Sequence, residues 1–246
     1  MAPATQLRGE MITVWDFDRT IVNDICDRWV VLDTGLTKLF TELRKTMPWN
    51  SLMDRMFEEL HSKGKTIDAF KNRLNSFTLD PHIISAIRSV HDLGCDLKVL
   101  SDANQFFIET ILKNNGVYDC FSEIITNPTV VNEEGRLRLF PYHGSNLPPH
   151  DCKFCPPNMC KGIVIDEIQD RDMKKRAMIY IGDGRDDLCP VLKLREGDHV
   201  MPKKNLPLYH LLSKATIPVK PKIHEWKDGE ELKNNLVKLI SPQVEV

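Results

Sequence analysis

The sequence predicts an α/β fold in which helices cover a parallel sheet and a small helical cap follows the first strand. Three observations support this prediction. Short apolar runs typical of buried strands alternate along the chain with segments of helical periodicity. Residues 24–77 contain amphipathic patterns and no convincing strand. Acid-rich motifs directly follow two of the apolar runs, at 16–20 and 182–187, as expected at the carboxyl edge of a parallel sheet.

The first strand is expected at residues 11–15, a continuous apolar run. Helical periodicity then predicts three cap helices, at residues 36–44, 51–61 and 67–77. Pro48 and Gly64 mark the breaks between these helices. We therefore expect a core formed by residues 1–23 and 78–246, and a helical cap formed by residues 24–77.

The core is expected to resume with a helix at 81–91. Asp80 fits its N-cap, Pro81 fits its first position, and Gly94 ends it. Further strands are expected at 97–100, 121–125, 177–181 and 199–201, and further helices at 106–113, 162–168 and 229–240. The segment 141–157 is rich in Pro, Gly, His and Cys, which predicts a loop or a small hairpin.

The composition is that of an ordinary globular protein, with 246 residues of which 41% are hydrophobic and 28% charged. A formal net charge of −2 gives no support to nucleic-acid binding. No apolar run approaches the roughly 20 residues that span a bilayer, and no signal-peptide core precedes residue 11. We therefore expect a cytoplasmic protein without nucleic-acid or membrane partners, whose seven cysteines are reduced. The sequence leaves the oligomeric state open.

Two carboxylates, Asp16 and Asp18, stand where the first strand ends. Side chains alternate along a strand, so both should point to one side and Phe17 to the other. Two carboxylates directed at one point indicate a metal site. Taken alone, however, an Asp-x-Asp sequence is also common turn and capping chemistry.

Further polar residues stand at the ends of strands or the starts of helices. In chain order the set is Asp16 with Asp18, then Ser101, Lys161, and Asp183 with Asp187. Each member has an ordinary structural explanation: Ser101 can cap the next helix, Lys161 can lie on the surface, and Gly182-Asp183-Gly184 can be a turn. All of them together, in this order, indicate a catalytic site.

This ordered set resembles that of haloacid-dehalogenase-type (HAD) phosphatases. Four motifs resemble more narrowly the phosphocholine/phosphoethanolamine phosphatase family, whose plant members include pyrophosphatase-like and thiamine-phosphate-phosphatase-like proteins. The motifs are DFDRTIVNDICDRWVV at 16–31, VLSDAN at 99–104, CPPNMCKG at 155–162 and IGDGRDD at 181–187. The resemblance covers about residues 11–240. It implies a HAD core, which is a Rossmann-like parallel sheet, with a C1-type helical cap.

The resemblance also implies a Mg²⁺-dependent phosphatase that acts through an aspartyl-phosphate. Asp16 would be the nucleophile and Asp18 the general acid and base, while Ser101 and Lys161 would bind the phosphate. Mg²⁺ would be held by Asp16, the backbone carbonyl of Asp18, and Asp183, with Asp187 orienting its waters. The chemistry agrees, because transferring a phosphoryl group to a carboxylate requires that anionic charge be neutralised first.

The substrate is less closely specified. The resemblance places Asp27 and Asp102 near the substrate's head group, where two acids favour a cation such as thiamine, choline or ethanolamine; both can instead be helix caps. Trp15, Trp29 or Phe57 could add cation–π contacts; Trp29, near Asp27, is the preferred candidate, whereas Trp15 lies within its strand and is expected in the core. Cys26 and Asp186 depart from the family pattern, which usually has Ser and a small or amide residue there. The alternatives are an inorganic pyrophosphatase of the same fold and a catalytically silent phosphometabolite-binding protein.

Three cysteines gather in the loop before the 162–168 helix. Cys152 and Cys155 form a Cys-x-x-Cys pair, Cys160 follows, and His143 and His150 are nearby. This pattern fits a zinc site with one histidine ligand, but it also fits buried or free thiols. The sequence does not decide between them.

Overall fold

The computed structural model describes residues 11–28, 34–144, 150–214 and 217–241. Its centre is a six-stranded sheet with the strand order β3-β2-β1-β6-β7-β8. Every neighbouring pair in this sheet is parallel. The strands are β1 (Met11–Trp15), β2 (Asp96–Asn104), β3 (Glu123–Asn127), β6 (Ala177–Gly182), β7 (His199–Pro202) and β8 (Lys222–Ile223). The predicted α/β fold is confirmed.

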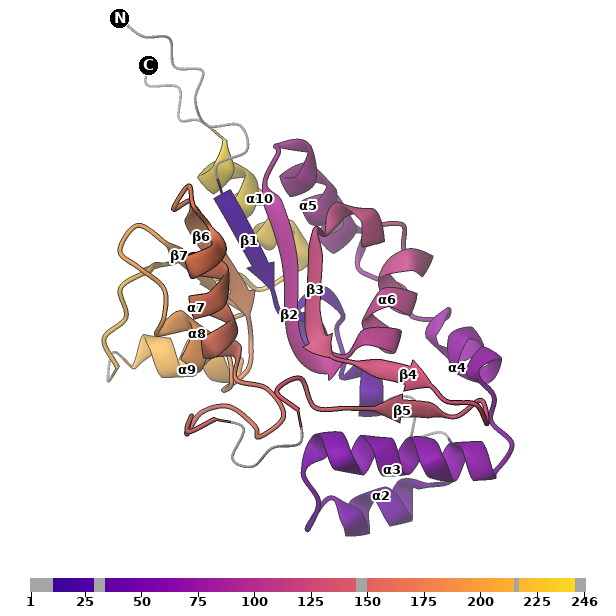
Figure 1. The fold of residues 1–246 in the computed structure, drawn as a ribbon. Coiled ribbons are helices and arrows are strands. Elements are labelled where there is room, and N and C mark those ends of the chain that lie inside the picture. Colours follow the sequence, from indigo (N-terminus) through magenta and orange to yellow (C-terminus); the bar gives the residue numbers. More distant parts are fainter. Residues whose placement is uncertain (1–10, 29–33, 145–149, 215–216, 242–246) are drawn as a thin grey trace, which may run out of the picture.

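Helices cover both faces of this sheet (Figure 1). One face carries α5 (Pro81–Asp92), α6 (Gln105–Asn114) and α10 (Gly229–Ile240), and the other carries α7 (Lys161–Arg171), α8 (Leu188–Val191) and α9 (Pro207–Ser213). Alternate side chains of a strand serve the two faces, as its pleat requires. Ile12 and Val14 pack with the second set of helices, whereas Trp15 packs with the first.

In the described residues after β1, helices α2 (Thr37–Leu43), α3 (Trp49–Ser62) and α4 (Ile67–Leu74) occupy the segments where helices were expected. Figure 1 shows α2 and α3 at the end of the sheet toward which β1 points. The hydrophobic cluster of the core continues into them without a break. Phe107 of α6 lies 5.5 Å from Phe57 and 6.4 Å from Phe70, measured between ring centroids. The cap helices are therefore anchored to the core by aromatic packing.

A hairpin that the sequence did not reveal completes this end of the molecule. Its strands are β4 (Thr129–Val131) and β5 (Leu137–Leu139), which pair antiparallel. Arg136 lies in the turn and pairs with Asp54 at 2.9 Å and with Glu58 at 3.0 Å, both on α3. The expected loop or hairpin at 141–157 is, over its described residues, a loop without strands.

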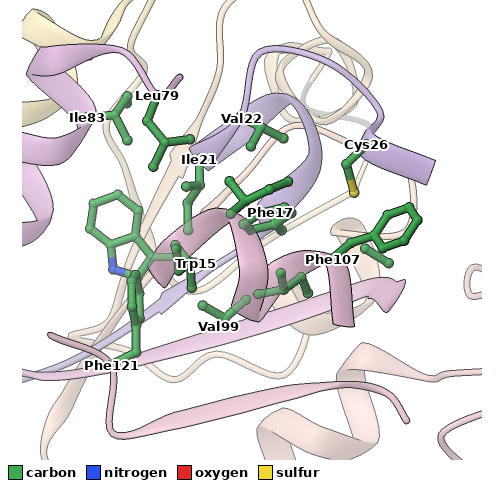
Figure 2. Packing of buried hydrophobic residues seen from close by; sticks show 14 of the residues in the cluster. Trp15, Phe17, Ile21, Val22, Cys26, Leu79, Ile83, Val99, Phe107 and Phe121 are labelled. Carbon is green, nitrogen blue, oxygen red and sulfur yellow. The ribbon is translucent and has the colours of Figure 1, made fainter. Parts of the chain in front are cut away.

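Two junctions position the polar residues. After β1 the chain makes a tight turn, η1 (Phe17–Ile21), in which Arg19 has a φ of 60°. Phe17 of this turn points into the hydrophobic cluster together with Ile21 and Val22 (Figure 2). Strand β2 runs past its expected end at residue 100, through an irregularity, to Asn104.

The remaining small element is the 3₁₀ turn η2 (Tyr118–Cys120). Within the described residues, no helix combines the length and the apolar character needed to cross a membrane.

Candidate active site

Asp16 and Asp18 lie at the carboxyl edge of the sheet and line a pocket with a volume of about 550 Å³. The backbone amide of Asp16 donates to the carbonyl of Ile181 at 2.9 Å, which fastens the end of β1 to β6. Asp18 accepts a hydrogen bond of 3.0 Å from the amide of Cys26. With Phe17 in the core, the two acids share the pocket side as predicted, but strand alternation is not the reason, because β1 ends at Trp15 and Asp18 belongs to the turn η1.

Lys161 is the first residue of α7, and its side chain is buried among acids. Its ammonium nitrogen lies 2.9 Å from Asp16, 2.7 Å from Asp186 and 2.7 Å from Asp187. Burial alone disfavours the ammonium ion, but the three carboxylates outweigh it and hold the pKa of Lys161 well above its usual value. Lys161 is therefore a fixed positive charge beside Asp16 and not a surface lysine.

Asp187 is fully occupied by donors inside the protein. Its Oδ1 accepts hydrogen bonds from Lys161 at 2.7 Å and from the Tyr180 hydroxyl at 2.6 Å. Its Oδ2 accepts from the backbone amides of Asp183 at 2.9 Å and Gly184 at 2.8 Å. A carboxylate offers about four lone-pair sites. Asp187 therefore holds the 183–184 turn and Lys161 in place and has little capacity left for a direct metal bond.

Gly182 makes room for this arrangement. A Cβ atom at this position would lie 2.6 Å from Oδ2 of Asp187 and 3.0 Å from the ring of Tyr180. A real side chain does not tolerate the first of these distances. The glycine before Asp183 is thus required by the approach of the Asp187 carboxylate.

The donor set fits a hard divalent cation. Carboxylate oxygens of Asp16 and Asp183, the two acids free to bind it directly, lie within 4.8 Å of each other and of the Asp187 carboxylate. Burial raises the pKa of Asp16 well above its usual value even though Lys161 opposes it, and burial together with Asp187 raises the pKa of Asp183 to about 7. The single positive charge of Lys161 does not neutralise these carboxylates. Oxygen-rich, anionic sites of this kind suit Mg²⁺.

The environment of Asp18 suits proton exchange. Burial, followed by repulsion from Asp27, raises the pKa of Asp18 to about 7, although the hydrogen bond from Cys26 opposes the shift. A carboxyl group with a pKa near neutrality can both donate and accept a proton at physiological pH.

Ser101 is fully buried within β2, and its Oγ accepts a hydrogen bond of 3.3 Å from the amide of Ala103. The helix that follows is capped by Asn104, whose side chain accepts from the amide of Phe107 at 3.0 Å. The capping explanations for Ser101 and Asp102 are therefore wrong. Asp102 instead lines the pocket, where burial and then Asp186 raise its pKa to about 7.

Asp27 lies behind the pocket wall. Its carboxylate accepts hydrogen bonds from Asn104 at 2.5 Å and from the indole of Trp49 at 3.4 Å, and Trp49 itself lines the pocket. Burial raises the pKa of Asp27 to about 7 despite these two donors. The structure thus separates Asp102, which faces the cavity, from Asp27, which supports its aromatic wall.

Of the aromatic residues singled out from the sequence, the two that the structure describes do not line the pocket. Trp15 and Phe57 are buried in the hydrophobic core, and Trp29 lies outside the described residues. Trp49 and Phe154 line the cavity instead. The one sequence signal for Trp49 was its place directly after Pro48, at the start of a cap helix.

Three arginines had no role in the sequence prediction, although Arg19 and Arg185 lie within the motifs at 16–31 and 181–187. The cavity is lined by Arg19 in the turn after β1, Arg44 at the end of α2, and Arg185 in the loop after β6. Arg44 lies over the Trp49 ring at 5.3 Å. The pocket therefore offers both acidic and basic groups.

Known proteins resemble this chain over nearly its whole length. A family model described as a putative phosphatase matches residues 11–240. A thiamine phosphate phosphatase-like protein from Arabidopsis thaliana is 49% identical over 236 residues, covering 95% of this chain and 96% of the relative. Inorganic pyrophosphatase 2 from the same plant is 47% identical over 236 residues, covering 95% of this chain and 85% of the relative.

The fold has solved counterparts as well. A HAD family hydrolase from Salmonella enterica subsp. enterica serovar Typhi superposes with a TM-score of 0.65 at 17% identity, covering 97% of this chain and 74% of that chain. At this identity the likeness concerns the fold, which is the parallel sheet that brings Asp16, Lys161 and Asp183 together.

Proposed function

The chain belongs to the putative phosphatase family and is a phosphatase of the HAD fold, and from this premise we propose that it is a Mg²⁺-dependent phosphomonoesterase for a small cationic organic phosphate. The small cationic phosphates that we propose as substrates are thiamine monophosphate, phosphocholine and phosphoethanolamine. One observation carries the proposal: Lys161, buried and charged, lies 2.9 Å from Asp16, which lines a pocket rich in acids.

The reaction proceeds in two steps, formation of an aspartyl-phosphate and its hydrolysis. A carboxylate oxygen of Asp16 attacks phosphorus, the P–O ester bond breaks, and Asp18 gives its proton to the departing alcohol oxygen. A water then attacks the phosphorus of the aspartyl-phosphate, Asp18 takes the water's proton, and the bond to Asp16 breaks to release phosphate. Dividing the transfer in this way replaces one difficult displacement by two easier ones.

The other residues hold charge and position. Lys161 neutralises phosphate oxygens as they approach Asp16, and Ser101 donates its hydroxyl to one of them. Mg²⁺ would be held by Asp16, Asp183 and the backbone carbonyl of Asp18, with Asp187 orienting its waters, and it would supply charge neutralisation for the transferring group. The four internal donors on Asp187 support this indirect role.

The pocket supports an organic head group. Its volume of about 550 Å³ exceeds what a lone phosphate needs, and Trp49 and Phe154 supply aromatic surface. Asp102 and Asp186 line the same cavity and favour positive charge in the substrate. The 49% identity to a thiamine phosphate phosphatase-like protein points in the same direction.

Inorganic pyrophosphate is the second candidate, and the arginines favour it. Arg19, Arg44 and Arg185 line the cavity and could bind a second phosphate. The 47% identity to an inorganic pyrophosphatase agrees with this possibility. Asp102 and Asp186 oppose it, because they would repel the second phosphate.

A phosphate-release panel tests the proposal. It contains the three cationic monoesters, pyrophosphate and a broader set of phosphometabolites, each with Mg²⁺. We expect the highest kcat/KM for one of the cationic monoesters and loss of turnover in Asp16→Asn, with an unchanged circular dichroism spectrum. The matched control Asp68→Asn, at an exposed position on α4, should retain full activity. A preference for pyrophosphate overturns the substrate class, and activity retained in Asp16→Asn overturns the mechanism. No turnover on any compound would favour a silent binding protein.

A further inference from the structure

Four cysteine side chains converge beside the pocket from parts of the chain that are distant in sequence. Cys152 and Cys155 come from the loop before α7, Cys160 is the N-cap of α7, and Cys189 belongs to α8. Their sulfur atoms all lie within 4.8 Å of one another. Cys189 had no part in the sequence prediction.

The spacing of these sulfurs fits a tetrahedral ion. Sγ of Cys189 lies 3.4 Å from that of Cys152 and 3.8 Å from that of Cys160. A tetrahedral zinc site with Zn–S bonds of about 2.3 Å places its sulfurs about 3.8 Å apart. We propose that Cys152, Cys155, Cys160 and Cys189 bind a structural zinc ion as four thiolates, releasing their thiol protons to solvent.

The fourth ligand is a cysteine and not a histidine. Both ring nitrogens of His150 are engaged, one with the carbonyl of Pro156 at 2.9 Å and the other with the amide of Cys152 at 3.2 Å. The ring of His143 packs against His150 with 5.6 Å between centroids. His150 thus braces the loop that carries the first two cysteines.

Two backbone amides donate to sulfurs of the cluster. The amide of Phe154 donates to Sγ of Cys152 at 3.4 Å, and the amide of Ile163, in the first turn of α7, donates to Cys160. Amides at a helix N-terminus favour negative charge, and donors to ligand atoms fix the orientation of those atoms.

Gly162 gives a second, independent sign that the position of Cys189 matters. A Cβ atom on Gly162 would lie 2.5 Å from the Cys189 sulfur. The absence of a side chain on α7 at this point lets α8 bring its sulfur into the cluster. The close approach of the Cys189 sulfur to Gly162 thus brings α7 and α8 together at the proposed zinc site.

Four protein ligands close the coordination sphere, so the ion would be structural and not catalytic. It would nevertheless lie close to the candidate active site. Cys160 directly precedes Lys161, Cys189 is two residues after Asp187, and Cys155 lines the pocket. The ion would therefore fix the pocket wall relative to the residues that hold Asp16.

Metal content tests this proposal independently of turnover. The full chain is expressed without added zinc, desalted, and analysed for zinc, iron and copper. We expect about one zinc per chain. Cobalt exchanged into the protein should give the visible spectrum of a tetrahedral tetrathiolate. Iron or copper in place of zinc, or no bound metal in folded protein, overturns the proposal.

Variants identify the ligands. Cys189→Ser and Cys152→Ser should each lose most of the zinc and lower the thermal midpoint, because a metal that binds only the folded chain stabilises it. Cys120→Ser, at a cysteine outside the cluster, and His150→Ala should both retain the metal. Cys152 is partly buried in a loop, so its variant reports even if Cys189→Ser does not fold. Full zinc in Cys189→Ser, or loss of zinc and a changed cobalt spectrum in His150→Ala, contradicts the Cys₄ assignment. These outcomes do not depend on the identity of the substrate.

Discussion

The hydroxyl of Tyr180 donates a hydrogen bond of 2.6 Å to the carboxylate of Asp187, and both side chains are fully buried. Tyr180 belongs to β6, whereas Asp187 follows the acidic turn after that strand. Through Asp187 the tyrosine holds Lys161, and through Lys161 it influences Asp16.

Tyr180→Phe tests this chain of contacts. The variant keeps the ring and removes one donor from a buried carboxylate, which typically costs about 1–3 kcal/mol. We expect a lower free energy of unfolding in urea and a lower kcat with KM nearly unchanged. Tyr209→Phe, on α9, is the control and should behave as wild type. Wild-type stability and kcat in Tyr180→Phe would show that the hydroxyl has no positioning role.

Gly182→Ala tests the steric fit beneath Asp187. The new methyl group would lie 2.6 Å from the carboxylate, so Asp187 or the turn must shift. We expect a destabilisation of about 1–3 kcal/mol and a clear loss of kcat. Gly64→Ala is the comparison. The φ of Gly64 is +77°, so an alanine at this position should lower stability only through backbone strain. Its stability should fall by about 1 kcal/mol while kcat stays unchanged. Equal kcat in both variants argues against the proposed fit.

Removal of the hard cation should abolish phosphate release reversibly. Brief treatment with EDTA, followed by desalting, should lower the rate at least about 100-fold, because anion must then approach anion without neutralisation. Added Mg²⁺ should restore the rate, and Asp183→Asn should require much more Mg²⁺ for half-maximal activity. Zinc content is measured before and after treatment, so that loss of one metal is not mistaken for loss of the other. Full activity in metal-free protein contradicts the prediction.

Asp102→Asn should change the choice of substrate. Removing a carboxylate from the pocket wall should raise KM for phosphocholine and lower KM for pyrophosphate, each by about fivefold for an interaction of about 1 kcal/mol. Asp27→Asn is the contrasting variant, because Asp27 lies behind Trp49 and not on the cavity surface. We expect a smaller change in the ratio of the two KM values. A larger effect from Asp27 would reverse the assignment of roles.

The free energy of unfolding should decrease as the pH falls, because of two histidines that lie far from the pocket. His199 and His224 share a contact of 2.9 Å between ring nitrogens, and burial lowers the pKa of both. Lys222 lowers both pKa values further, Asp198 opposes the shift at His199, and Lys238 lines the same hollow.

The direction follows from these shifts. The folded pKa values lie below the unfolded value of about 6.5, so the unfolded chain binds more protons in this range. Stability from the pair is complete above about pH 6.5 and is lost as pH falls through the folded values. Thermal midpoints from pH 7.5 to 5 should show this slope, and His199→Asn/His224→Asn should flatten it. An unchanged slope in the double variant excludes the pair as its source.

The sequence predicted those parts of the fold that have strong local patterns. Strand β1 has the predicted bounds, and α5 begins at Pro81 with Asp80 as its cap. The hairpin β4–β5 was missed because strands of three residues are too short to show a periodic pattern. Strand β2 was ended too early because its last residues are polar, yet they are held by neighbours that only the fold supplies.

The residues of the candidate site also fall into those that the sequence predicted and those that it could not. Asp16, Lys161 and Asp183 lie in recognisable motifs, and the structure brings them together. Trp49, Tyr180 and Cys189 could not be assigned from sequence, because their relevance depends on contacts between distant segments. Asp27 and Asp102 lie in one predicted group, but folding places one of them in the cavity and the other behind its wall.

Asn104 performs two tasks with one amide group, since its oxygen accepts from α6 and its nitrogen donates to Asp27. Aspartate could replace it as a helix cap but would set a second negative charge against Asp27. Serine could cap as well, but it is too short to reach both partners, and glutamine is too long for the cap. Natural variation and laboratory evolution should therefore find this position closed to single exchanges.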